Sequence, residues 1–185
     1  MTCRHRKNMP LIWLMTDERI GEAALLAAVA RLPRGRAGII FRHYRTAPGA
    51  RRALFDAVRA IARRRRLTLL LAGTARQAAA WAADGWHGRD VRRAARPMRH
   101  SAPVHDAREM VAARRGGADM VLLSPLFPTR SHPGGASLGR VRFAKLARGA
   151  DMPVIALGGV KREHGRMLRT MGAAGWAAID GLVSE

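Results

Sequence analysis

Short apolar runs alternate with longer amphipathic stretches along almost the whole chain. Runs such as 120–123 and 153–157 are apolar at nearly every position, which is typical of parallel strands buried on both faces. The stretches between the runs are rich in alanine and arginine and show helical spacing. We therefore expect strands at 11–15, 37–41, 67–72, 84–87, 98–102, 120–123, 153–157 and 176–179, and helices at 21–32, 50–65, 74–83, 106–115, 141–148 and 162–171.

This alternation predicts an α/β fold, a compact single-domain TIM (β/α)₈ barrel of parallel strands. An open, doubly wound sheet is the alternative, because it would give a similar pattern. The chain has 185 residues, whereas such barrels usually have about 250, so we expect short loops and some helices reduced to a turn. The barrel domain is expected over residues 10–185, after a basic, disordered leader at 1–9.

Arginine supplies nearly all of the positive charge of the chain, whose net charge is +21. A charge this high raises the possibility of nucleic-acid binding, because basic side chains displace counterions from phosphate backbones. The basic residues are nevertheless spread along the chain and are not interleaved with aromatic residues. The densest cluster, 63–66, ends a predicted helix, where cations favour the carbonyl end of the helix dipole. We therefore favour an arginine-rich surface over a nucleic-acid interface.

The sequence contains few features that would place the protein outside the cytoplasm. Its uncharged apolar stretches are shorter than the roughly 18 residues of a membrane span, and 11–15 is too short for the core of a secretion signal. Cys3 is the only cysteine, which excludes disulfides and cysteine-rich metal sites. We expect a cytoplasmic protein without a membrane partner.

The longest loop after an apolar run covers 124–135. Active sites of (β/α)₈ barrels form at the carboxyl ends of the strands, so the residues that follow each run are the candidates. This loop combines prolines and glycines with hydroxyls and cations, which an anionic phosphate would need. A surface loop with ordinary turn chemistry is an equal alternative. The candidate phosphate-binding residues here are Ser124, Thr129, Arg130, Ser131 and His132.

Gly158 and Gly159 directly follow the run at 153–157. Because glycine has no Cβ, backbone amides at these positions can approach a ligand closely. Loops after the seventh and eighth strands commonly form the phosphate site of such barrels, and Asp180 and Gly181 follow the eighth run. A glycine pair also serves any tight turn, but its position favours a phosphate site.

Polar residues also follow the first two runs. Arg42 and Tyr44 are candidates for binding a carboxylate or phosphate, and an exposed loop is an equal alternative. Asp17 either orients a neighbouring cation or caps the next helix, and we favour capping. Trp13 is expected to fill the core or close the mouth of the barrel. The spacing of the histidines does not indicate a metal site.

Segments 118–121, 124–133 and 152–160 together resemble the thiamine-phosphate synthases and their TenI-type relatives. They are similar to the family's Gly-Ala-Asp strand lead, its Phe-Pro-Thr loop and its Pro-Val-x-Ala-x-Gly-Gly strand. The resemblance extends over 11–182. It implies a TIM barrel in thiamine biosynthesis that binds a phosphorylated small molecule, either thiazole phosphate or pyrophosphate. Members of this superfamily often dimerise, so the resemblance also implies a homodimer.

The resemblance implies magnesium only for a true synthase, which joins a pyrimidine pyrophosphate to a thiazole phosphate. The sequence departs from the synthase pattern where that site would form. Tyr44 and His132 stand in place of lysines, and 72–73 is Ala-Gly where the family has Asn-Asp. The metal-binding segment is shortened to 87–90, which leaves Asp90 alone. Magnesium needs oxygen ligands, so we expect neither a metal nor another cofactor.

The TenI branch of the family carries out a chemistry that needs no metal. Its tautomerases move a proton on a thiazole carboxylate phosphate, and the catalytic histidine of that branch corresponds to His105. Histidine suits the role because both of its protonation states are available near neutral pH. His105 could instead only precede or cap the helix at 106–115. A tautomerase is our leading hypothesis, and a synthase or a non-catalytic phosphate-binding barrel are the alternatives.

Overall fold

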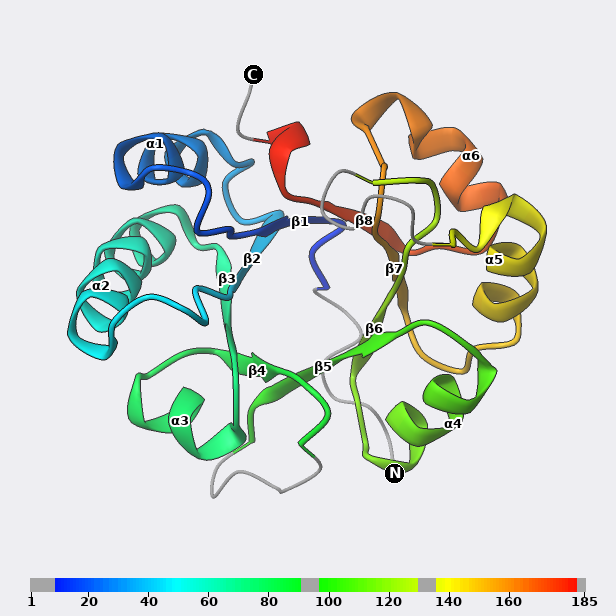
Figure 1. The fold of residues 1–185 in the computed structure, drawn as a ribbon, viewed down its shortest axis with the longest axis horizontal. Helices are drawn as coiled ribbons and strands as arrows, with labels where there is room; N and C mark the ends of the chain where they lie inside the picture. Colours follow the sequence, from blue (N-terminus) through cyan, green and yellow to red (C-terminus); the bar gives the residue numbers. More distant parts are fainter. Residues whose placement is uncertain (1–8, 91–96, 130–135, 183–185) are drawn as a thin grey trace.

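A computed structural model describes residues 9–90, 97–129 and 136–182. Its strands are β1 (Ile12–Met15), β2 (Ala37–Phe41), β3 (Thr68–Ala72), β4 (Gly85–His87), β5 (Arg99–Val104), β6 (Met120–Leu123), β7 (Val154–Ala156) and β8 (Gly175–Ala178). They form a closed barrel of parallel strands in chain order, in which β1 pairs with both β2 and β8 (Figure 1). The predicted TIM-type barrel is confirmed, and the open sheet is excluded. Most of the leader predicted at 1–9 lies outside the described residues.

The helices surround the barrel (Figure 1). They are α1 (Glu22–Arg31), α2 (Pro48–Arg65), α3 (Ala75–Ala80), α4 (Ala107–Arg115), α5 (Gly139–Arg148) and α6 (Gly165–Thr170). Two short 3₁₀ turns, Arg162–His164 and Asp180–Leu182, follow β7 and β8. In the described parts of the chain, none of the helices has the length and hydropathy to cross a bilayer.

Side chains that point inward fill the barrel. Trp13 of β1 is fully buried there, and its indole Nε1–H donates to the carbonyl oxygen of Pro10 at 2.8 Å. The indole ring covers Gly38 of β2, where an added Cβ would lie only 2.3 Å from the ring carbon Cζ3. Glycine is therefore needed at this point of the strand. The other buried members of this interior cluster are Met15, Ile40, Leu70, Ala72, Met120, Leu122, Ile155 and Ala177.

The side chain of Asp106 fixes where α4 begins. It is the N-cap residue of α4, and its Oδ1 accepts the backbone N–H of Glu109 at 2.8 Å. Helices leave their first N–H groups without partners inside the helix, and an aspartate at the cap satisfies one of them. His105 thus stands just outside the helix, between the end of β5 and the cap.

Candidate active site

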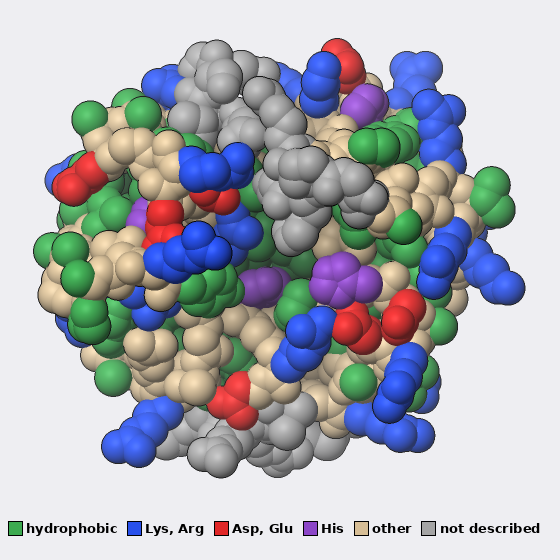
Figure 2. All heavy atoms as spheres, in the orientation of Figure 1, with side chains coloured by type: hydrophobic (Ala, Val, Ile, Leu, Met, Phe, Trp, Pro, Cys, Tyr) green, Lys and Arg blue, Asp and Glu red, His purple; other side chains and the backbone are tan. Residues whose placement is uncertain are grey.

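The predicted site residues that the structure describes all lie after the carboxyl ends of strands. Ser124 follows β6 and His105 follows β5, while Arg42 and Tyr44 follow β2. Figure 2 shows one face of the molecule, hollowed in the middle, with histidine side chains in and beside the hollow and basic side chains around it. Outside the described residues lie Arg130, Ser131 and His132, together with the side chain of Asp180.

The loop after β6 pairs with the segment after β7. The N–H of Leu126 donates to the carbonyl of Leu157 at 2.8 Å, and the N–H of Phe127 donates to the carbonyl of Gly158 at 3.1 Å. These bonds place the first residues of the predicted phosphate loop beside the glycine pair. Gly181 lies close to the same segment, since an added Cβ would come within 3.7 Å of the Val160 carbonyl oxygen.

Gly158 and Gly159 both have a backbone that disfavours other residues. Their φ angles are +95° and +62°, a region that glycine enters without steric cost. A Cβ on Gly158 would lie 2.7 Å from the Cα of Pro125, so the chains approach closely here. Within the described part of the chain, the N–H groups of the two glycines have no hydrogen-bond acceptor. These amides are therefore candidates for binding an anion.

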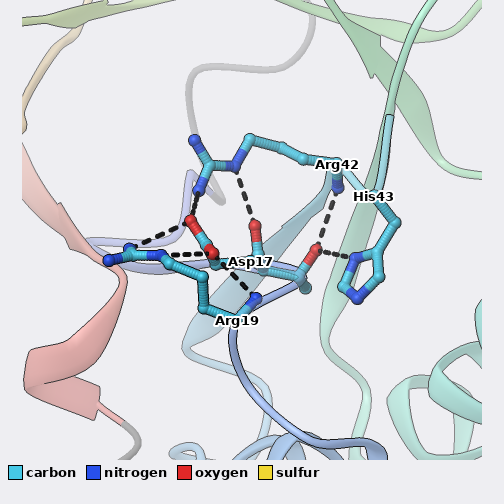
Figure 3. A network of polar contacts seen from close by, with 5 residues as sticks. Asp17, Arg19, Arg42 and His43 are labelled. Atoms are coloured by element: carbon cyan, nitrogen blue, oxygen red, sulfur yellow. Dashed lines mark hydrogen bonds and ion pairs between the residues drawn. The ribbon is translucent and has the colours of Figure 1, made fainter. Parts of the chain in front are cut away.

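Arg42 is held by a set of polar contacts at the end of β2 (Figure 3). Its backbone N–H donates to Thr16 Oγ1 at 2.9 Å, and its Nε donates to the Thr16 carbonyl oxygen at 2.8 Å. Its Nη2 donates to Asp17 Oδ2 at 3.0 Å, and Thr16 Oγ1 also contacts Nδ1 of His43 at 2.9 Å. Among the residues that the structure describes, Nη1 has no hydrogen-bond partner, and 22% of the side-chain surface is exposed.

Asp17 orients cations and does not cap a helix. Arg19 and Arg42 approach its carboxylate from two sides in Figure 3, and Nε of Arg19 lies 2.7 Å from Asp17 Oδ1. The hydrogen bond from Arg19 is the main reason why the pKa of Asp17 lies below its usual value. The helix cap that we predicted here is wrong, because α1 begins at Glu22, after the N-cap residue Gly21.

Tyr44 contrasts with Arg42, two positions before it. Its side chain is largely exposed, with 65% of its surface accessible. This exposure agrees with the alternative interpretation of the sequence, in which Tyr44 lies in an exposed loop and does not bind a carboxylate or phosphate.

His87 is a buried histidine that our sequence analysis did not select. It ends β4, and its Nδ1 lies 2.8 Å from Ser101 Oγ on the neighbouring strand β5. Burial, followed by the nearby charge of Arg42, lowers the pKa of His87 to about 3. The ring is therefore neutral at physiological pH. The only signal in the sequence was its place at the end of a short strand.

We predict that His87→Gln makes folding stability less sensitive to acid. Burial lowers the pKa of His43, His87 and His100, so below about pH 6.5 the unfolded chain binds protons that the native state does not. Each such histidine removes up to about 1.4 kcal/mol of stability per pH unit as the pH falls. Urea unfolding between pH 6.5 and 4 measures this slope, and parallel curves for variant and wild type would contradict the prediction.

His105 is paired with a carboxylate on the next helix. Its Nδ1 lies 2.8 Å from Oε2 of Glu109, and the same oxygen accepts the backbone N–H of His105 at 2.8 Å. Arg89 holds the other oxygen, with Nη2 at 2.6 Å from Oε1. Because Asp106 is the N-cap of α4, the alternative that His105 caps this helix is wrong. Glu109 was not among the residues predicted from the sequence, although it lies only four residues after His105.

Glu109 is ionised at neutral pH. Burial alone would raise its pKa, but the hydrogen bonds from His105 and the charge of Arg89 outweigh burial and lower the pKa below its usual value. The side chain of His105 remains 49% exposed, and its other nitrogen, Nε2, has no hydrogen-bond partner among the described residues.

The residues at the rim of the barrel, where the strands have their carboxyl ends, do not fit a magnesium site. Magnesium requires several oxygen ligands, but Ala72, which ends β3, and Gly73, which follows it, provide no carboxylate. The carboxylates of Asp17 and Glu109 are engaged by arginines. In 9–90, 97–129 and 136–182, there is no group of three or more histidine, cysteine, aspartate or glutamate residues that could hold a metal ion.

Comparison with known proteins decides the family. A family model described as thiamine monophosphate synthase matches residues 12–182. The chain belongs to the thiamine-phosphate synthase family. The resemblance noted in the sequence is confirmed, and the family places this chain in thiamine biosynthesis.

Curated members of the thiamine-phosphate synthase family match almost the full chain. The thiamine-phosphate synthase of Roseiflexus castenholzii is 30% identical over 184 residues, which cover 94% of this chain and 81% of the relative. That of Chlorobium luteolum is 31% identical over 182 residues, covering 93% and 84%. Among solved structures, thiamine phosphate pyrophosphorylase from Pyrococcus furiosus superposes with a TM-score of 0.77 at 20% identity, covering 96% of this chain and 89% of that one. This structural likeness supports the fold.

Proposed function

We propose that this chain moves a proton within a thiazole carboxylate phosphate without a metal ion, with His105 as the general acid and base. The contact between His105 and Glu109 carries the proposal. With Nδ1 held by a carboxylate, Nε2 is the nitrogen that can exchange a proton with a ligand at the barrel mouth. A tautomerisation removes a proton from one atom and returns one to another, so a single histidine acting first as base and then as acid is sufficient.

The groups around the mouth suit a ligand with two anionic ends. The N–H groups of Gly158 and Gly159 have no backbone acceptor among the described residues and lie after β7, where barrels of this type commonly bind phosphate. Arg42 lies after β2, and its Nη1 has no hydrogen-bond partner in the described parts of the chain. An arginine held in place by its neighbours binds a carboxylate with good geometry. We assign the phosphate to the glycine pair and the carboxylate to Arg42.

Thiamine-phosphate synthesis is the second candidate function, because curated relatives that match nearly the whole chain bear that name. The residues at the end of β3, Ala72 and Gly73, weigh against it, because they provide no carboxylate. The synthase reaction expels pyrophosphate, and a magnesium ion would stabilise the departing charge.

An assay with and without a chelator separates the two candidates. We expect the purified chain to convert thiazole carboxylate phosphate into its aromatic isomer at the same rate in EDTA and in magnesium, followed by proton NMR. Formation of thiamine phosphate from both synthase substrates, only in magnesium, would instead establish the synthase. Binding without either reaction would identify a phosphate-binding barrel that is not an enzyme.

We predict that Gly159→Ala weakens binding of thiazole phosphate by about tenfold, or 1.4 kcal/mol. Its Cβ would lie 2.7 Å from the carbonyl oxygen of Pro128, which forces the backbone amide away from its present position. The measurement is the rise in thermal midpoint with ligand concentration, which reports binding to the native state.

Gly35→Ala is the matched control for this variant. Gly35 has a similar φ of +69°, but an added Cβ there would meet no atom within 4 Å. It therefore carries the same backbone cost without disturbing the rim. Equal ligand affinities for the two variants would contradict the assignment of phosphate to the glycine pair.

A further inference from the structure

We propose that Glu109 is a positioning residue, which fixes the tautomer of His105 so that Nε2 faces the barrel mouth as the base. The inference deepens the proposed proton transfer and rests on it for its functional meaning. It assigns to a side chain on α4 a task that is separate from binding the ligand. Arg89 completes the arrangement, because it holds Glu109 from the opposite side.

The geometry of Glu109 differs from that of an ordinary helix cap. In a capping box, the glutamate at the third helical position reaches back to the backbone N–H of the N-cap residue. Here Oε2 of Glu109 accepts instead from the residue before the cap, and it accepts from both the backbone N–H and the ring Nδ1 of His105. A structural cap needs only the backbone bond. The second bond, to the ring Nδ1, determines which ring nitrogen of His105 carries the proton.

The contacts join three separate segments of the chain. His105 lies at the end of β5, Glu109 lies in the first turn of α4, and Arg89 lies after β4. Arg89 takes Oε1 at 2.6 Å, which leaves Oε2 to face the histidine. Asp106 fixes the start of the helix through the N–H of Glu109. Both carboxylate oxygens of Glu109 are thus held, Oε1 by Arg89 and Oε2 by His105.

The chemical consequence follows from which atoms of the Glu109 carboxylate and the His105 ring can donate a hydrogen bond and which can accept one. An ionised carboxylate only accepts hydrogen bonds, so Nδ1 of His105 must carry the proton in their contact. The neutral ring then has no proton on Nε2, which is the state required of a base. When Nε2 takes a proton from the ligand, the carboxylate beside the ring offsets the new positive charge.

The test measures the tautomer directly and needs no turnover. We would record the ¹⁵N resonances of the histidine rings in the wild type and in Glu109→Ala, with His105→Gln used to assign the His105 signals. The neutral ring in the wild type should carry its proton on Nδ1. In Glu109→Ala the proton should move largely to Nε2, and Glu109→Gln should fall between the two, because its side-chain oxygen can still accept.

Turnover gives the second readout. Glu109→Ala should lower kcat for proton transfer by about tenfold or more, the scale on which a group that orients a catalytic histidine contributes. KM should stay nearly constant, because Glu109 is not among the groups assigned to the ligand. Glu109→Gln should recover part of the lost kcat.

Asp106→Ala is the matched control for a purely structural effect. It removes the cap of α4 and should cost about 1 kcal/mol of stability, but it leaves the carboxylate of Glu109 in place. Its thermal midpoint should fall at least as far as that of Glu109→Ala, while the tautomer of His105 stays unchanged.

The outcomes separate this inference from the proposed function. An unchanged His105 tautomer in Glu109→Ala overturns the positioning role, even if His105 proves essential for turnover. A tautomer that moves in Glu109→Ala but not in Asp106→Ala supports the positioning role. If the tautomer moves while His105→Gln retains full proton transfer, Glu109 still positions the ring, and it is the proposed function that fails.

Discussion

Replacing His105 with alanine should reduce kcat for proton transfer by a factor of about 10² to 10⁴, the usual contribution of a general acid or base. The affinity for thiazole phosphate should change by less than about twofold, because the groups assigned to its phosphate follow β7 and not β5. The side chain of His105 is half exposed, so its removal should cost little packing. The rate of isomer formation and the ligand-dependent thermal midpoint measure the two effects separately.

His164→Ala is the control for this experiment. This histidine also lies beyond the carboxyl end of a strand, in the 3₁₀ turn after β7. Its Nδ1 accepts the N–H of Lys161, and among the described residues the ring has no carboxylate contact of hydrogen-bond length. It should retain wild-type kcat. If His105→Ala retains it as well, another group at the mouth exchanges the proton, and His87 becomes the first candidate.

The fold could be predicted from the sequence because buried parallel strands leave a strong pattern. Runs such as 120–123 and 153–157 contain the strands found at those positions, β6 and β7. The closure of the sheet into a barrel could not be predicted in the same way. It depends on the pairing of β1 with β8, in which Ile12 lies beside Trp176. Periodicity within one segment carries no information about this long-range contact, so an open sheet stayed possible.

The site was only partly predictable, for a related physical reason. Parallel strands of one barrel end at the same rim, so the sequence could predict that His105, Arg42 and the glycine pair lie at one rim, while their roles stay predictions. That prediction said nothing about which side chains would bond to one another. Asp17 is of a residue type that often caps helices, but its carboxylate contacts Arg19 and Arg42, and α1 begins only at Glu22. Likewise, the contact of Glu109 with His105 depends on where α4 begins relative to β5.

Replacing Trp13 with alanine should lower the free energy of unfolding by about 3–5 kcal/mol. The indole is fully buried in the barrel interior and donates to the carbonyl of Pro10. Its removal leaves a cavity that the rigid surrounding strands cannot close. Urea unfolding at neutral pH measures the loss. Because Trp13 packs in the barrel interior, the same variant tests whether the groups assigned to the ligand depend on the packing there.

A second substitution, Gly38→Ala, tests whether the effect of Trp13→Ala depends on the contact between the indole ring and Gly38. In the wild type, Gly38→Ala places a Cβ 2.3 Å from the Trp13 ring, and such overpacking should cost about 1–3 kcal/mol. In the Trp13→Ala background the ring is gone, so Gly38→Ala should become neutral or stabilising. The two changes should therefore be strongly non-additive, as expected for residues in contact. Additive losses would mean that the tryptophan does not pack over this glycine, and that something else requires glycine in the middle of β2.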